Sequence, residues 1–207
     1  MLAITNGKIY TMTGKVFDKG TLLIKEGKIL EVGQEIAIPQ DAKVVDAGGK
    51  YVFPGFIDAH SHIGIFEEAV GEIGEEGNEW TEPVTPQLRA IDAINPGDKA
   101  FEDAVMGGIT CVFTGPGSAN VIGGQSVVMK TYGKIIDHMV VKEPAGLKVA
   151  FGENPKRVYG DQKKMPATRM ATAALLRDAL VEAQNYKAKR EKSLKDPDEI
   201  HERDLGM

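Results

Sequence analysis

The stretch from Pro54 to Gly64, Pro-Gly-Phe-Ile-Asp-Ala-His-Ser-His-Ile-Gly, constrains this chain more than any other. It continues an apolar run that begins at Tyr51, and this run predicts a buried strand that ends in His60 and His62. Residues two apart in a strand point to the same face, so both imidazoles are expected to reach one point beyond the strand end. Two converging nitrogen ligands suit Zn²⁺ or a similar divalent ion. The alternative is that two histidines lie together on the surface by accident.

With this stretch the chain resembles the amidohydrolase superfamily of metal-dependent hydrolases, in the imidazolonepropionase- and dipeptidase-like branch. In that family, Pro-Gly-Phe-Ile-Asp-x-His-x-His closes a small β domain and opens a (β/α)8 barrel. The resemblance implies an α/β fold: a small antiparallel β-sandwich part over residues 1–53, the first half of a TIM-type barrel over 54–192, and a charged tail over 193–207. It also implies that His60 and His62 bind the first of one or two divalent metals, with Zn²⁺ as the first expectation.

Composition excludes several other classes of protein. The chain has 207 residues, 42% of them hydrophobic and 27% charged, with a formal net charge of −5. This acidic balance argues against a nucleic-acid partner, and no apolar run approaches the roughly 18 residues that a membrane-spanning helix needs. The N-terminus lacks the layout of a secretory signal, and the single cysteine, Cys111, cannot form an internal disulfide. We therefore expect a cytoplasmic protein with neither a nucleic-acid nor a membrane partner.

The first 53 residues alternate short β-rich runs with glycine-containing turns. Residues 21–25 and 28–32, joined by Glu26-Gly27, predict a hairpin, and two further strands are expected at 43–46 and 50–53. The segment is therefore interpreted as a small antiparallel β unit. It is similar to the start of the amidohydrolase β-sandwich, which the C-terminal end of the chain completes in that family.

Residues 63–94 are irregular and acidic, which is typical of a functional or disordered loop. Asn95-Pro96 then predicts a helix start, and residues 109–114 predict the second barrel strand, with Cys111 buried in it. The glycine-rich segment 115–125 follows this strand. It is either a substrate-facing loop, with Asn120 and Gln125 as candidate substrate-binding residues, or merely a tight connection.

Residues 127–132 and 135–141 predict an inserted hairpin, in which His138 is expected to be packed or solvated. Residues 147–151 predict the next barrel strand, with Glu153 at its C-terminal tip. Glu153 is the candidate third metal ligand or bridge, and the alternative is that it caps loop amides. Three residues of the same loop are candidates to hold a substrate carboxylate or polarise a carbonyl: Lys156, Arg157 and Tyr159. Solvent exposure is the alternative for them.

The strongest helical pattern begins at Thr168, the expected cap, and continues to about residue 192 with a stripe of apolar positions predicted to be buried. The charged tail that follows contains His201, which is expected to be solvated.

The resemblance implies hydrolysis of an amide, cyclic amide or peptide-like carbon–nitrogen bond of a small molecule by a metal-activated water. Asp58 would support catalysis by orienting a ligand or shaping the strand end. The family scheme also needs two later histidines and an aspartate, which have no counterpart here, and a complete barrel takes about 250 residues. We therefore expect a truncated enzyme that lacks a C-terminal half or associates with itself. The alternative function is a catalytically incomplete product that is inactive or acts only by association.

Overall fold

The computed structural model describes residues 1–195 and 203–206, and His201 lies outside them. The chain divides into two compact units, Met1–Phe56 and Ile57–Met207. The predicted boundary between residues 53 and 54 falls just before this division. None of the described helices is long and apolar enough to cross a membrane.

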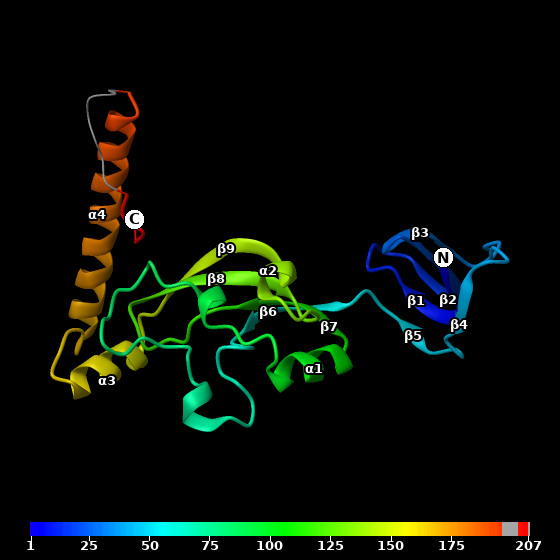
Figure 1. Ribbon diagram of the computed structural model, residues 1–207, viewed down its shortest axis with the longest axis horizontal. Coiled ribbons are helices and arrows are strands. Elements are labelled where there is room, and N and C mark those ends of the chain that lie inside the picture. The colour runs from blue at the N-terminus through cyan, green and yellow to red at the C-terminus, as the bar shows by residue number, and fades with distance from the viewer. Residues whose placement is uncertain (196–202, 207) are drawn as a thin grey trace. The chain divides into compact units, whose positions relative to one another are not determined.

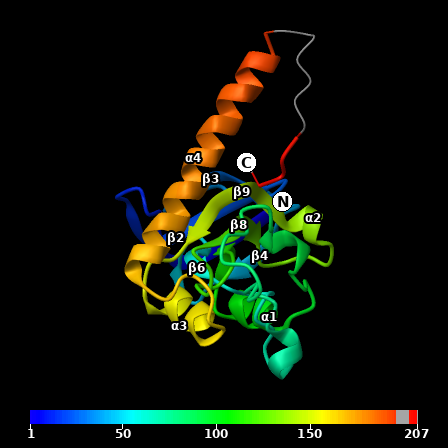
Figure 2. The ribbon, with the colours of Figure 1, turned by 90° about the vertical axis from the view of Figure 1, so that its left-hand side faces the viewer.

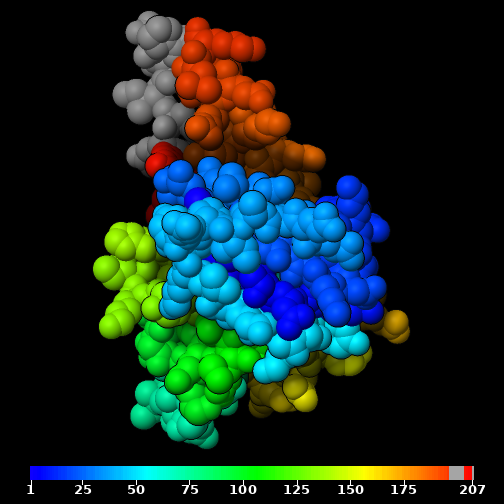
Figure 3. Space-filling view, turned by 90° about the vertical axis from the view of Figure 1, so that its right-hand side faces the viewer, coloured from blue at the N-terminus to red at the C-terminus, as the bar shows by residue number. Residues whose placement is uncertain are grey.

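The N-terminal unit is built on one five-stranded sheet, and its atoms are blue and cyan in Figure 3. Its strands are β1 (Leu2–Tyr10), β2 (Val16–Lys25), β3 (Lys28–Gly33), β4 (Lys43–Asp46) and β5 (Tyr51–Val52). The predicted hairpin is present: β2 and β3 pair antiparallel, and Glu26 and Gly27 both have positive φ, as a type I′ turn requires.

The expectation of an entirely antiparallel unit is wrong. Strands β4 and β5 both pair with β1 in parallel, so the sheet is mixed. The reason is the connection: the long segment after β3 carries the chain back to the start of β1, so that β4 enters beside β1 in the same direction. Ala3, Ile9 and Leu23 are buried on this sheet.

The second unit contains a four-stranded sheet in the order β6-β7-β8-β9 (Figure 1). The strands are β6 (Phe56–Ser61), β7 (Ile109–Thr114), β8 (Ile122–Lys130) and β9 (Val140–Val149). Strand β8 runs antiparallel to both β7 and β9. The predicted second barrel strand is therefore present as β7, and Cys111 is buried in it as expected.

Three predicted strands need correction. Residues 127–132 and 135–141 do not form a hairpin of their own: β8 already begins at Ile122, and the short helix α2 (Ile136–Met139) separates it from β9. Residues 147–151 are not a separate barrel strand either, because residues 147–149 are the end of β9. Strand β9 pairs with β8 on both sides of residues 143–145, where the register shifts, so the segments predicted as separate strands belong to one strand.

Helix α1 (Lys99–Met106) and the acidic segment pack on this sheet, and two further helices, α3 (Glu153–Asp161) and α4 (Arg169–Ser193), contact each other. Helix α1 starts later than Asn95-Pro96 predicted, because Asp98 is the residue whose side chain accepts from the Ala100 backbone N–H (3.1 Å). Thr168 caps α4 as predicted, accepting from Ala171 N. The apolar stripe predicted to be buried is wrong: of the helix, only Thr172 is buried, and α4 extends away from the sheet (Figures 1 and 2).

The acidic segment 63–94 is ordered. Backbone hydrogen bonds join Glu67 N to Gly74 O (2.9 Å) and Glu76 N to Ile65 O (2.9 Å), and two 3₁₀ helices lie within it. The core of this unit combines residues of this segment with α1, α2 and the sheet: Ile65, Ala90, Ile94, Phe101, Val112, Val127, Met129 and Met139. The segment is therefore part of the packed domain, and its glutamates project from an ordered backbone.

Candidate metal centre

His60 and His62 lie together at the C-terminal end of β6. Their ring centroids are 5.3 Å apart, with an interplanar angle of 73°. Two imidazoles bound to one tetrahedral ion at metal–nitrogen distances of about 2.0 Å would have centroids about 5 Å apart. The spacing of this pair therefore fits two ligands of a single zinc-like ion. His60 is exposed and His62 is half-buried.

A backbone carbonyl fixes the chemical form of His62. Its Nδ1 lies 2.7 Å from the carbonyl oxygen of Gly115. A carbonyl oxygen can only accept a hydrogen bond, so Nδ1 carries a proton, and in the neutral ring Nε2 keeps its lone pair. Metal-binding histidines in proteins commonly use their second ring nitrogen in this way.

Hydrogen bonds between β6 and β7 place this carbonyl beside the histidine. Ser61 Oγ donates to Phe113 O (3.1 Å), and Thr114 Oγ1 donates to Ile63 O (3.0 Å). The contacting residues advance in the same direction along both strands, so β6 and β7 run parallel and their C-terminal ends share one edge of the sheet. This edge is where barrel enzymes build their active sites.

Asp58 acts on the backbone at the strand end. Its Oδ1 accepts a hydrogen bond from the backbone N–H of His60 (3.0 Å). Of the two roles expected for Asp58, this contact corresponds to shaping the end of the strand from which His60 projects.

The structure does not bring Glu153 together with the two histidines. Glu153 is the first residue of α3, its side chain is 84% exposed, and Lys156 Nζ donates to its Oε1 at 2.7 Å. This hydrogen bond lowers the pKa of the Glu153 carboxyl. Within residues 1–195 and 203–206, no three His, Cys, Asp or Glu side chains are grouped closely enough to hold a metal ion. The described part of the chain therefore offers two ligands, and the role of Glu153 as a third stays a prediction.

The two candidate amides of the glycine-rich segment face protein atoms. Asn120 is 1% exposed, and its Nδ2 donates to Glu82 O (2.9 Å) and to Thr85 Oγ1 (3.2 Å). Gln125 Nε2 donates to Pro86 O (3.0 Å). Both amides therefore attach the acidic segment to the start of β8. These contacts favour a tight structural connection over a substrate-facing loop for the segment 115–125.

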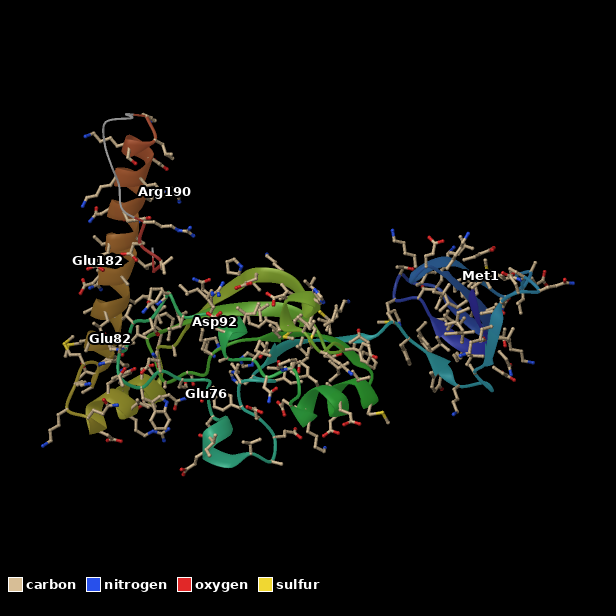
Figure 4. All side chains as sticks on the ribbon, viewed as in Figure 1. Met1, Glu76, Glu82, Asp92, Glu182 and Arg190 are labelled. Carbon is tan, nitrogen blue, oxygen red and sulfur yellow. The ribbon has the colours of Figure 1, made fainter. Side chains whose placement is uncertain are left out.

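The cationic and phenolic candidates on α3 are not brought together at one site. Tyr159 is fully buried, and its hydroxyl lies 3.0 Å from Glu79 O and 2.7 Å from Glu82 O, beside the acidic segment in which Figure 4 labels Glu82. Burial raises the pKa of Tyr159 to about 12. Lys156 is engaged by Glu153, while Arg157 is exposed. Tyr159 therefore stabilises the fold and does not face solvent.

Sequence reasoning missed two neighbours of His62. One is Gly115, whose role lies in its backbone carbonyl and not in a side chain. The other is Phe66, whose ring meets that of His62 edge-on at a centroid distance of 5.3 Å and an angle of 79°. No motif marks either residue; the apolar Phe66 within an acidic stretch is the signal that indicates a packed position there.

No protein-family model matches the chain. An amidohydrolase from Thermotoga maritima MSB8 of known structure superposes on all of the chain with a TM-score of 0.95 and 49% identity, and the match covers 53% of that protein. Amidohydrolase tasK of Hapsidospora irregularis is 32% identical over 178 residues, which are 79% of this chain and 18% of that protein. A dihydroorotase of Anaeromyxobacter dehalogenans is 32% identical over 121 residues, which are 58% of this chain and 23% of that protein.

The chain belongs to the amidohydrolase superfamily, and its α/β architecture is that of part of such a protein, as the resemblance predicted. It spans about half of the Thermotoga amidohydrolase and less than a quarter of these two curated relatives.

Proposed function

We propose that the chain supplies the first metal ligands of a metal-dependent amidohydrolase, with His60 and His62 binding a divalent ion, Zn²⁺ in the first instance. The observation that carries this proposal is the paired geometry of the two rings together with the hydrogen bond that leaves Nε2 of His62 free to bind. The hydrolase class itself is supported by the relatives named amidohydrolase, dihydroorotase and imidazolonepropionase.

The reaction we propose is hydrolysis of an amide, cyclic amide or peptide-like carbon–nitrogen bond in a small molecule. When bound, the metal would acidify a water molecule and polarise the substrate carbonyl. Residues of this chain orient the two ligands: Asp58 accepts a hydrogen bond from the backbone N–H of His60, and the Gly115 carbonyl keeps the proton of His62 on Nδ1. We further propose the cytoplasm as the compartment, because the single cysteine is buried and unpaired.

Titration of the metal-free chain with Zn²⁺ in a calorimeter tests the metal site. The wild type is expected to bind one ion per chain, and His60→Ala and His62→Ala are each expected to weaken binding at least tenfold, because each removes one of two ligands. His138→Ala is the matched control, because His138 is an exposed histidine of the same unit. Equal affinity of the wild type and both site variants would exclude this pair as the metal site.

The described residues also favour a second candidate function, a catalytically incomplete chain that acts only by association. Two ligands leave a metal weakly held, and no third ligand is grouped with them in the described ranges. The sheet of the second unit also exposes large apolar residues: Ile57 is 71% exposed, Val141 55% and Leu147 48%. Exposed apolar surface and open strand edges promote association.

Amidase assays with Zn²⁺ present, combined with sedimentation velocity, separate the two candidates. Turnover of an amide or cyclic amide by a chain that holds one metal supports the hydrolase. A metal-free chain that neither turns over such substrates nor sediments as a monomer supports the incomplete product. A stable, inactive monomer would count against association as the activity.

A further inference from the structure

His62 is held on two sides by groups that do not themselves bind metal. On one side Nδ1 donates to the Gly115 carbonyl at 2.7 Å, and on the other the Phe66 ring lies edge-on to the imidazole. His60 lacks such a bond: among residues 1–195 and 203–206 its ring contacts the His62 ring and makes no hydrogen bond. The two neighbouring histidines therefore differ in how firmly they are oriented.

Gly115 can occupy its position only because it has no side chain. A Cβ at this residue would lie 2.0 Å from Ser126 Oγ and 2.7 Å from Ser126 Cβ, whereas the Ser126 Cα is 3.4 Å away. Ser126 belongs to β8 and is buried, so it has little room to move. The backbone of Gly115 needs no left-handed conformation, so the requirement is for space alone. Packing of β8 against the end of β7 thus determines where the carbonyl points.

The position of Phe66 is fixed in a similar way. Its backbone N–H donates to His62 O (3.1 Å), and its backbone pairs with Glu75 across the acidic segment. A Cβ on Gly77 would lie 2.2 Å from the Phe66 ring, so a glycine at this position is what admits the ring. The ordered acidic segment therefore places an aromatic ring against His62.

We infer that Gly115 and Phe66 are positioning residues that hold His62 as an Nε2 ligand before any metal arrives. The first limits the ring to one tautomer through its carbonyl, and the second limits ring rotation through contact. The identity of the ligand atom rests on the proposed metal site, but the tautomer and the ring orientation do not. Because the free protein already holds His62 in one tautomer, metal binding does not have to shift the ring from one tautomer to the other.

Nitrogen-15 NMR of the metal-free chain at about pH 8.5, where imidazoles in water are neutral, reads the tautomer directly. The His62 ring is expected to show a single tautomer with the proton on Nδ1, and the His62→Gln variant identifies its signals. The exposed His60 is the internal reference, expected to populate both tautomers. A His62 signal with the proton on Nε2, or a mixture like that of His60, overturns the inference.

Four variants then test the cause. Gly115→Ala is expected to give His62 mixed tautomers and to weaken Zn²⁺ binding 10- to 100-fold, as loss of such outer contacts does elsewhere. The double variant Gly115→Ala/Ser126→Gly removes both clashing atoms and is expected to restore the tautomer and the affinity, while Ser126→Gly alone leaves them unchanged. Gly33→Ala is the control, because its Cβ would meet Ile36 atoms no closer than 3.5 Å.

Phe66 is tested separately. Phe66→Ala is expected to weaken Zn²⁺ binding about tenfold while the proton stays on Nδ1, because the Gly115 bond is retained. Phe66→Leu should recover part of the affinity, and circular dichroism shows which variants are folded. Wild-type affinity in Phe66→Ala, or in a folded Gly115→Ala, overturns the inference. A wild type with the expected tautomer that binds no Zn²⁺ would leave the positioning intact and exclude the proposed metal function.

Discussion

Tyr159 offers a prediction whose size follows from the structure. Its side chain is fully buried and its hydroxyl contacts the carbonyls of Glu79 and Glu82. Tyr159→Phe removes this hydrogen bond and leaves two buried acceptors without the donor, so we expect the free energy of unfolding at neutral pH to fall by about 1–2 kcal/mol. Urea denaturation followed by the fluorescence of Trp80, the only tryptophan, measures this, because Trp80 O accepts from Gln162 Nε2 at 2.9 Å beside the same contact.

The same residue predicts how stability changes at alkaline pH. Burial raises the pKa of Tyr159 from 10.0 to about 12, so the folded state retains the phenol proton in the range where the unfolded state loses it. This contribution is complete below pH 10 and is lost as the pH rises towards 12. Between pH 8 and pH 11 the wild type should lose about 1.4 kcal/mol more than Tyr159→Phe, which brings the two proteins close together.

The matched control is Tyr132→Phe, because Tyr132 is 85% exposed. We expect it to change neither the neutral stability nor its alkaline slope. If the difference between wild type and Tyr159→Phe stays constant from pH 8 to pH 11, Tyr159 does not ionise differently in the two states and the reasoning fails.

Three further substitutions test the framework of the second unit. Asp98 is buried and accepts hydrogen bonds from the backbone N–H groups of Gly64, Glu68 and Ala100. Asp98→Ala should therefore lower the free energy of unfolding, measured in urea, by about 2–3 kcal/mol. A loss below about 0.5 kcal/mol would show that water replaces these hydrogen bonds. Thr168→Ala should cost about 1 kcal/mol and reduce the 222 nm circular dichroism; an unchanged spectrum and melting curve would contradict a capping role. Gly124→Ala should lower stability by about 2 kcal/mol or more in a thermal melt, because φ is +122° and the added Cβ would lie 2.5 Å from Leu88 O; a wild-type melting temperature would refute the close approach.

The sequence predicted those turns, strands and helix caps that depend only on residues close together in the chain. The Glu26-Gly27 turn, the strand at residues 109–114 and the cap at Thr168 each depend on a few neighbouring residues, and all three are present. The pairing of the two histidines is of the same kind, because strand alternation alone brings His60 and His62 to one side.

Features that depend on distant residues were not predicted. The parallel pairing of β4 with β1 depends on the course of the connecting loop, and the start of α1 depends on Asp98 reaching back to Gly64 and Glu68. Candidate substrate residues were proposed because they are polar and follow a strand. Sequence alone does not show that Asn120 and Tyr159 face backbone carbonyls of the acidic segment.

The antiparallel strand β8 determines which loops lie at the edge of the sheet that carries His62. Because β8 runs opposite to both of its neighbours, β9 regains the direction of β7, and the chain leaves both strands towards the edge that carries His62. The turn after β9, which leads into α3, therefore grows from the same rim as the turn after β7. Each antiparallel strand added to a sheet reverses the direction of the chain. Adding two such strands in succession therefore keeps later loops at the same edge, whereas adding one would move them to the opposite edge.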